Sequence, residues 1–131
     1  MILGIGTDIV PIDRIEKTLA EQGERFINRC FAPNEITDKD PTAAFCAKRW
    51  AAKEACAKAL GLGICDGIYL RDIMVMNDTA GRPSLTLTGG AKERLTAITP
   101  RGMTPLTHVS LADDGGMAMA FVVISAQKEQ A

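Results

Sequence analysis

The sequence is poor in the residues that build zinc, redox and disulfide centres. Its 131 residues include one histidine and four cysteines, and no two cysteines stand in a C-x-x-C spacing. A zinc site of the usual cysteine and histidine type is therefore not available. The cysteines are expected to be free, buried thiols in a reducing cytosol. They are Cys30, Cys46, Cys56 and Cys65.

An excess of either charge is also missing. Lysine and arginine total 15 and aspartate and glutamate 16, for a net charge of −1. The bulk charge thus gives no indication of nucleic acid or an acidic membrane as a partner. Aromatic residues make up 5% of the chain against 47% hydrophobic residues overall, which suits an ordinary α+β core rather than disorder. The length predicts one domain over residues 1–131.

Targeting and membrane segments are not indicated either. Met1 is followed by Ile-Leu-Gly without a basic region, so a secretory signal peptide is not expected. The late apolar run over 115–127 is too short to span a bilayer. We therefore expect a soluble, cytoplasmic protein without a membrane partner.

The most informative stretch that is present covers residues 48–60. It is rich in alanine and free of proline and glycine, which predicts a helix, and the Gly-Leu-Gly sequence at 61–63 predicts its end. Trp50, Glu54 and Lys58 recur four residues apart and share one face of that helix. Taken alone, this pattern is typical of a solvated face with a Glu–Lys pair.

The first strand, residues 2–10, brings a second carboxylate. Alternation places Gly4, Gly6 and Asp8 on one face of this strand. Two glycines in a strand indicate close approach by another part of the molecule. Asp8 suits either metal or hydroxyl binding, or capping of the turn before Pro11. A dinucleotide-binding loop is rejected, because the third glycine of that motif and a βαβ unit are missing.

The remaining segments complete an α+β pattern. Helices are predicted over 11–22, 24–31 and 91–98, and hairpins over 68–76 with 84–88 and over 106–112 with 117–126.

Asp8 and Glu54 converge if the long helix packs its Glu54 face near the end of the first strand. Two carboxylates together with waters and phosphate oxygens are the usual ligands of Mg²⁺. Arg49, Lys53 and Lys58, on nearby turns, are suited to neutralise phosphate charge. Such a set fits phosphoryl transfer on a metal-bound pyrophosphate, and nothing in these residues selects the substrate.

Four segments together resemble one enzyme family. They are Gly-Ile-Gly-Thr-Asp-Ile-Val at 4–10, the helix and its continuation over 48–64, Asn-Asp-x-x-Gly-Arg-Pro at 77–83, and His-Val-Ser-Leu-Ala-Asp at 108–113. In this order they resemble the holo-acyl-carrier-protein synthases, the short bacterial class of 4′-phosphopantetheinyl transferases. The resemblance covers essentially the whole chain.

The resemblance implies a fold, an assembly and a reaction. The implied fold is the 4′-phosphopantetheinyl transferase fold, with an antiparallel sheet packed against the long central helix. The implied assembly is a homotrimer whose three sites are each built across a subunit boundary. The implied reaction moves 4′-phosphopantetheine from coenzyme A to a serine of apo acyl carrier protein, with Mg²⁺ as cofactor, and releases adenosine 3′,5′-bisphosphate.

The resemblance also implies roles for individual residues. Asp8 and Glu54 match the metal-binding pair, and Lys58 joins them as a catalytic residue that holds the pyrophosphate. The implied coenzyme contacts are Arg49, Lys53, Lys58, Gly61, Gly63, Arg82, Pro83 and His108. Arg14 matches the surface that docks the acidic carrier protein, and the nearby Lys17, Arg25 and Arg29 are the best further candidates for it.

The sequence departs from the family pattern at two positions. Some members carry a second histidine where this chain has Asp113, and Trp50 stands where phenylalanine is commoner. No histidine base is therefore assigned at 113, and either a water or Glu54 takes the serine proton. His108 itself is either a packed core histidine or a coenzyme contact.

Two other functions compete with this interpretation. One is a different Mg²⁺-dependent phosphotransferase that binds ATP through the glycine-rich first strand, although the chain is short and lacks a second nucleotide-binding half. The other is a non-enzymatic oligomeric binding module, in which Asp8 and Glu54 have no chemical role.

Overall fold

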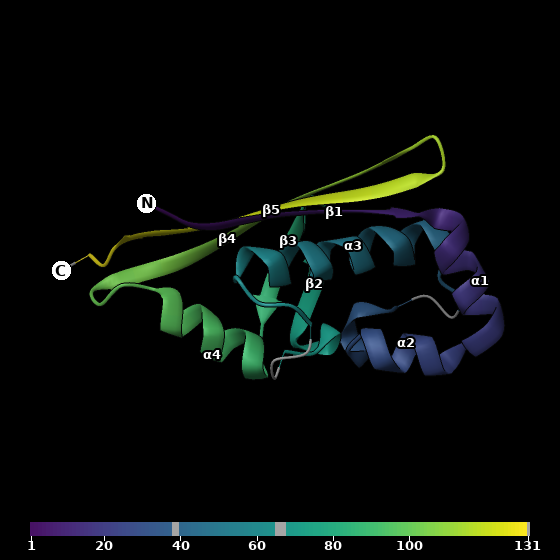
Figure 1. The fold of residues 1–131 in the computed structure, drawn as a ribbon, viewed down its shortest axis with the longest axis horizontal. Coiled ribbons are helices and arrows are strands. Elements are labelled where there is room, and N and C mark those ends of the chain that lie inside the picture. The colour runs from purple at the N-terminus through teal and green to yellow at the C-terminus, as the bar shows by residue number, and fades with distance from the viewer. Residues whose placement is uncertain (38–39, 65–67, 131) are drawn as a thin grey trace.

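The computed structural model describes residues 1–37, 40–64 and 68–130; Cys65 falls outside these ranges. Figure 1 shows the arrangement of the elements. In chain order they are β1 (Ile2–Pro11), α1 (Ile12–Gln22), α2 (Glu24–Cys30), the 3₁₀ helix η1 (Pro33–Glu35), α3 (Ala43–Ala59), the 3₁₀ helix η2 (Leu70–Asp72), β2 (Ile73–Asn77), β3 (Pro83–Leu87), α4 (Gly89–Ile98), β4 (Met103–Asp114) and β5 (Met117–Lys128).

A three-stranded antiparallel sheet in the order β1-β5-β4 lies along one side of α3 (Figure 1). The predicted α+β fold, with an antiparallel sheet on a long helix, is confirmed. The hairpin β4–β5 turns through Gly115 and Gly116, whose φ angles are 56° and 78°. Both glycines are needed there, because a two-residue turn between twisted strands requires positive φ at both positions.

The predicted close approach at the first strand is made by α3. A Cβ atom added to Gly4 would lie 1.9 Å from the carbonyl oxygen of Ala59, and one added to Gly6 would lie 1.9 Å from that of Ala55. Any side chain at either glycine would therefore push the helix off the strand. The alanines of α3 allow the same closeness from the other side, and most of this helix is buried.

The opposite face of the sheet is apolar and exposed. The residues concerned alternate along their strands with the buried ones, so they belong to one continuous face. We call this the outer sheet face; its exposed large residues are Ile5 and Ile9 of β1, Leu106 of β4, and Met119 and Phe121 of β5. An apolar patch of this kind on a small protein is a mark of an interaction surface.

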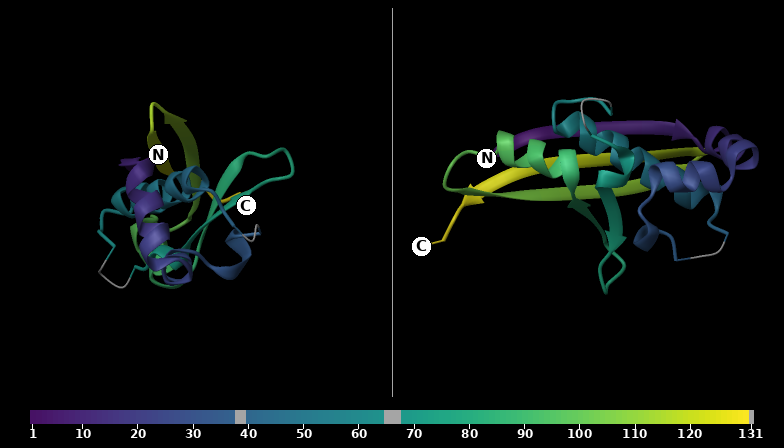
Figure 2. Two further views of the ribbon diagram at one scale, coloured as in Figure 1. Left: turned by 90° about the vertical axis from the view of Figure 1, so that its right-hand side faces the viewer. Right: turned by 90° about the horizontal axis from the view of Figure 1, so that it is seen from below.

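β2 and β3 form a separate two-stranded hairpin, the arm, which projects from the body (Figure 2). The prediction of a strand over 68–76 is wrong in its first part. Leu70–Asp72 form a 3₁₀ turn instead, because the Asp72 carboxylate accepts the Tyr69 N–H while the Asp72 carbonyl accepts the Thr88 N–H at 2.8 Å. Strand pairing consequently begins at Ile73.

Cys30, Cys46 and Cys56 are free and buried, as predicted. Within the described residues, every helix is too short or too polar to cross a lipid bilayer.

Candidate active site

The first part of the site is an acid and lysine cluster between β1 and α3. Because Gly4 and Gly6 let the helix lie directly on the strand, Lys58 reaches the end of β1. Its ammonium group donates hydrogen bonds to Asp8 Oδ1 at 3.1 Å and to the Thr7 carbonyl at 2.9 Å. Lys58 remains 55% exposed and Asp8 15% exposed, so the pair is open to solvent on its lysine side.

Glu54 belongs to the same cluster, as the helical spacing predicts. Burial raises the pKa of the Glu54 carboxyl, and the negative charge of Asp8 raises it further. Lys58 and Arg14 act in the opposite direction and favour the ionised form. Asp8 and Glu54 therefore lie close enough for their charges to interact, and their mutual repulsion indicates a place where positive charge is favourable.

The donor atoms of this cluster suit a hard divalent cation. Asp8 Oδ2 is buried and, within the described ranges, has no hydrogen-bond partner. An unpartnered buried carboxylate oxygen is costly unless a cation or water completes it. Among the residues that the structure describes, no three His, Cys, Asp or Glu side chains lie together in a way that could hold a metal ion. Water and substrate oxygens would therefore supply the other ligands. That ligand balance is typical of Mg²⁺.

Arg14 stands next to the cluster rather than only on a distant rim. Its guanidinium lies 5.6 Å from the centre of the Trp50 ring, one helical turn from Glu54. This is within the range of a cation–π contact. Lys17 on α1 and Arg25 on α2 are exposed, so the structure leaves this basic surface accessible.

The second part of the site is a basic cavity of about 510 Å³ between α3, the arm and β4. Its basic residues are Lys48, Arg49 and Arg82. Arg49 donates to Asn77 Oδ1 at 3.2 Å and lies 4.1 Å from the centre of the Phe45 ring, so its guanidinium is held in place. The cavity is lined by Thr42, Ala44, Phe45, Lys48, Arg49, Asn77, Gly81, Arg82, Pro83, Val109, Ser110 and Leu111. It suits an anionic ligand with a partly apolar body.

The two parts lie on different sides of α3. Arg49 and Glu54 are five residues apart, which corresponds to a rotation of about 140° around the helix axis. One copy of the chain therefore presents its acid and lysine cluster toward β1 and its basic cavity toward the arm.

Lys53 is the clearest departure from the sequence-based expectation. Its side chain is fully buried and pairs with the equally buried Glu35, with Lys53 Nζ 2.8 Å from Glu35 Oε1. The prediction that Lys53 contacts a coenzyme directly is wrong, because the ammonium group is enclosed and its hydrogen bonds are taken up inside the protein.

His108 and the two glycines after α3 lie elsewhere. His108 is exposed on β4, 3.1 Å from Ser125 Oγ, so the alternative of a packed core histidine is excluded. Gly61 has a φ of 78° and stops α3 as predicted. Gly61 and Gly63 are not among the residues that line the basic cavity, since twelve residues of helix, about 18 Å, separate Gly61 from Arg49. Their role toward a ligand stays a prediction.

Of the cavity residues, sequence reasoning predicted only Arg49, Arg82 and Pro83, and two polar residues that it missed are Lys48 and Asn77. Lys48 forms an ion pair with Asp113 at 3.0 Å, and Asn77 holds Arg49. Both stand at the edges of the motifs that carried the resemblance. Their roles depend on contacts across 28 residues or more, which no local pattern encodes.

Comparison with known proteins agrees with this geometry. The family model of the 4′-phosphopantetheinyl transferase superfamily matches residues 4–112. Holo-[acyl-carrier-protein] synthase of Cereibacter sphaeroides is 54% identical, over 100% of this chain and 98% of its own length. The protein of the same name from Chelativorans sp. is 50% identical, over 96% of this chain and 97% of its own length.

Solved structures agree as well. The Helicobacter pylori holo-[acyl-carrier-protein] synthase in complex with coenzyme A is similar with a TM-score of 0.78 and 35% identity, covering 92% of this chain and 99% of its own. The Neisseria meningitidis enzyme has a TM-score of 0.80 and 34% identity, covering 95% and 99%. With matches this extensive in both sequence and structure, the chain belongs to the 4′-phosphopantetheinyl transferase superfamily and, within it, to the holo-acyl-carrier-protein synthases.

Proposed function

We propose that this protein transfers the 4′-phosphopantetheine group of coenzyme A to a serine of apo acyl carrier protein. The observation that carries the proposal is the cluster of Asp8, Glu54 and Lys58. There a buried carboxylate oxygen, without a partner among residues 1–37, 40–64 and 68–130, lies beside an exposed ammonium group. Such a cluster can hold a cation and a phosphate at once. Relatives named as holo-acyl-carrier-protein synthases supply the identity of the substrates.

Asp8 and Glu54 would hold Mg²⁺, which when bound neutralises the pyrophosphate and stabilises the charge that develops during transfer. Lys58, one turn from Glu54, lies where it can neutralise a phosphate oxygen. The serine Oγ forms the new bond to phosphorus while the bond to the bridging oxygen breaks, and adenosine 3′,5′-bisphosphate departs with that oxygen. The raised pKa of Glu54 makes its carboxylate a better acceptor for the serine proton, directly or through a water.

The basic cavity is the proposed place of the nucleotide end of coenzyme A. Lys48, Arg49 and Arg82 bring positive charge to a ligand that carries a 3′-phosphate and a pyrophosphate. Pro83 and the Phe45 ring offer apolar surface to a base. The cavity and the cluster lie on different sides of α3, so coenzyme A would bridge the cavity of one copy and the cluster of another.

A homotrimer built through the outer sheet face provides such a bridge. This face is apolar and exposed in the single chain, and it runs along the sheet that carries Asp8 on its inner side. His108 lies on the outer face too, so it would reach the coenzyme at a subunit boundary. The number of subunits rests on the family resemblance.

The decisive experiment mixes the protein with Mg²⁺, coenzyme A and apo acyl carrier protein and follows the carrier by mass spectrometry. We expect the carrier to gain one phosphopantetheine group, and to gain nothing when coenzyme A is omitted or when EDTA replaces Mg²⁺. A carrier of unchanged mass in the complete mixture would overturn the proposal. A matched control is apo carrier protein whose acceptor serine is replaced by alanine.

A further inference from the structure

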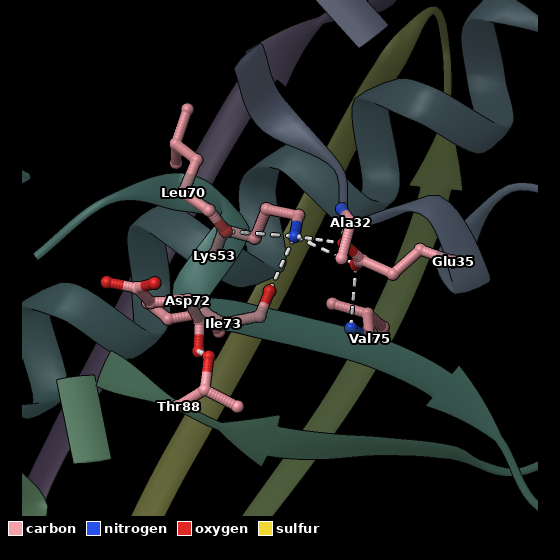
Figure 3. Close-up of polar contacts among 8 residues, drawn as sticks. All are labelled: Ala32, Glu35, Lys53, Leu70, Asp72, Ile73, Val75 and Thr88. Carbon is pink, nitrogen blue, oxygen red and sulfur yellow. Dashed lines mark hydrogen bonds and ion pairs between the residues drawn. The ribbon is translucent and has the colours of Figure 1, made fainter. Parts of the chain in front are cut away.

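Beside the acid and lysine cluster, the chain contains a second lysine and carboxylate pair that is closed to solvent. The Lys53 and Glu35 side chains are both 0% exposed. The Lys53 ammonium donates to both Glu35 oxygens, at 2.8 and 3.0 Å, and also to the carbonyl groups of Leu70, at 3.0 Å, and Ile73. Figure 3 shows this ammonium group surrounded by its acceptors.

The carboxylate of Glu35 is equally well occupied. It accepts the Ala32 N–H at 2.7 Å and the Val75 N–H at 2.9 Å (Figure 3). The pair therefore ties four elements together, since Lys53 belongs to α3, Glu35 to η1, Leu70 to η2 and Val75 to β2. Burial lowers the pKa of Lys53 and the Glu35 charge opposes that change, as expected for an ion pair enclosed in protein.

These bonds attach to the base of the arm. Lys53 and Glu35 bind the backbone of β2 at Ile73 and Val75, the first and third residues of that strand. On the β3 side the arm contacts the sheet through a longer hydrogen bond, from Thr107 Oγ1 to the Leu85 carbonyl at 3.5 Å. The buried pair thus joins the base of the arm to α3 and η1, alongside the core packing of Ile73, Val75 and Leu87.

The other end of the arm forms a wall of the basic cavity. Asn77, at the end of β2, accepts a hydrogen bond from Arg49, and Arg82 and Pro83 line the cavity from the start of β3. The facing wall is α3 itself, with Phe45 and Arg49. Lys53 stands one helical turn after Arg49, so α3 carries both one wall and the anchor of the opposite wall.

From this arrangement we infer that Lys53 and Glu35 are positioning residues for the coenzyme site, which set the distance and register between the arm and α3 and so the fit of the nucleotide. The inference rests on the proposed function for the identity of the ligand. Directional hydrogen bonds to β2 backbone groups fix where the strand lies along its length, in addition to the packing of its buried side chains. Misplacement of a binding wall by about 1 Å is enough to weaken a preorganised site.

The test uses the Lys53→Met/Glu35→Gln double variant, which removes both buried charges and nearly keeps the side-chain volumes. Replacing a buried pair as a unit is tolerated far better than breaking it. We expect a folded protein whose dissociation constant for coenzyme A, measured by calorimetry, rises about 10-fold, while KM for the carrier protein stays within about 2-fold. An unchanged dissociation constant would overturn the inference.

A stability control and a second measurement separate positioning from a general loss of stability. Ile15→Ala removes core side chain beneath α1, outside the arm, and should lower Tm while leaving coenzyme A affinity unchanged. Hydrogen exchange should accelerate over residues 73–87 of the ligand-free double variant and stay as in the wild type in β4 and β5. Weaker coenzyme A binding without faster exchange in the arm would show direct contact by Lys53 and overturn positioning.

Two further comparisons cover a double variant that fails to fold and a wild-type protein that fails to bind coenzyme A. If the double variant does not fold, Glu35→Asp retains both charges but shortens the carboxylate side chain by one methylene. It should still raise the dissociation constant for coenzyme A, and wild-type affinity in that variant would refute the inference. A wild-type protein that binds no coenzyme A would instead contradict the proposed function, while the hydrogen-exchange comparison still tests whether the pair anchors the arm.

Discussion

Lys53 and Lys58 stand five residues apart on the same helix, and each pairs with a carboxylate from a distant part of the chain. Their surroundings are opposite. Lys53 is enclosed with Glu35, and every oxygen of that carboxylate is occupied. Lys58 is 55% exposed, and its partner Asp8 has one buried oxygen that has no hydrogen-bond partner in the part of the chain that the structure describes.

Similar ion pairs can thus be divided into those that hold the fold together and those that can bind a ligand. A pair whose hydrogen bonds are all made inside the protein has nothing left to offer a ligand, so it can only hold elements together. A pair that is open on one side and incomplete on the other can exchange partners. Charge and sequence spacing are alike at the two lysines, and only their surroundings assign the roles.

The largest expected contrast is in stability. Lys53→Met alone leaves the Glu35 charge buried without its partner and should lower the free energy of unfolding by about 3–5 kcal/mol. Lys58→Met should change it by no more than about 1 kcal/mol, because solvent screens the exposed ammonium group. Urea unfolding followed by circular dichroism measures both. Equal losses in the two variants would contradict the comparison.

For catalytic activity, in contrast to stability, the large losses are expected at the open acid and lysine cluster. Asp8→Asn and Glu54→Gln should each lower kcat about 100-fold or more, because a charged oxygen is lost where phosphate charge develops. The fold should persist in both variants, since each replacement nearly preserves volume. Turnover by the carrier-modification assay at saturating Mg²⁺ checks this, and near-wild-type rates would contradict the proposed metal ligands.

The outer sheet face offers a test of why the site needs more than one chain. Phe121→Glu places a charge in the middle of this apolar face and should convert the proposed trimer to monomers with at least about 10-fold lower activity. Light scattering at micromolar concentration measures the mass. Thr96→Glu, an equal charge change on the exposed surface of α4, should leave the mass unchanged. A wild-type protein that is a stable, active monomer would contradict this prediction.

A smaller effect is expected at the proposed docking surface. Arg14→Glu should raise KM for the carrier protein by about 10-fold at low salt and leave KM for coenzyme A nearly unchanged. The difference from wild type should shrink as salt rises, because charges are screened beyond about 8 Å at physiological ionic strength. Lys92→Glu on α4 makes the same charge change far from α1 and serves as the control. A defect confined to coenzyme A would mean that α1 faces the nucleotide.

The smallest effect concerns pH and the repulsion inside the acid pair. The pKa of Glu54 is raised in the folded protein, so its protonated form is favoured there. The contribution of protonated Glu54 to the stability of the fold is fully present below the pKa of Glu54 in the unfolded chain, and it is lost as the pH rises through its pKa in the folded protein. In EDTA, Glu54→Gln should therefore gain stability relative to wild type as the pH rises from acidic to neutral. Thermal unfolding across that range measures it, and parallel pH profiles would contradict the assignment.

Local sequence was sufficient for most of the fold. The alanine-rich stretch formed the long helix, Gly61 ended it, and the pair Gly115 and Gly116 turned the last hairpin. The start of the arm's first strand was mispredicted because Ile68, Tyr69 and Leu70 favour a strand, while the Asp72 carbonyl bonds to the N–H of Thr88, which is 16 residues away.

The candidate site divides in the same way. Spacing along the helix put Glu54 and Lys58 on one face, and the two glycines of β1 indicated that something must lie against Asp8. By itself, then, the sequence determined the elements, the glycine contact and the residue types of the acid cluster, because these depend on neighbours within a turn or a strand. Tertiary structure alone decided that Lys53 is enclosed and Lys58 is open, because burial depends on Glu35 and β2, which are distant in the chain and adjacent only after folding.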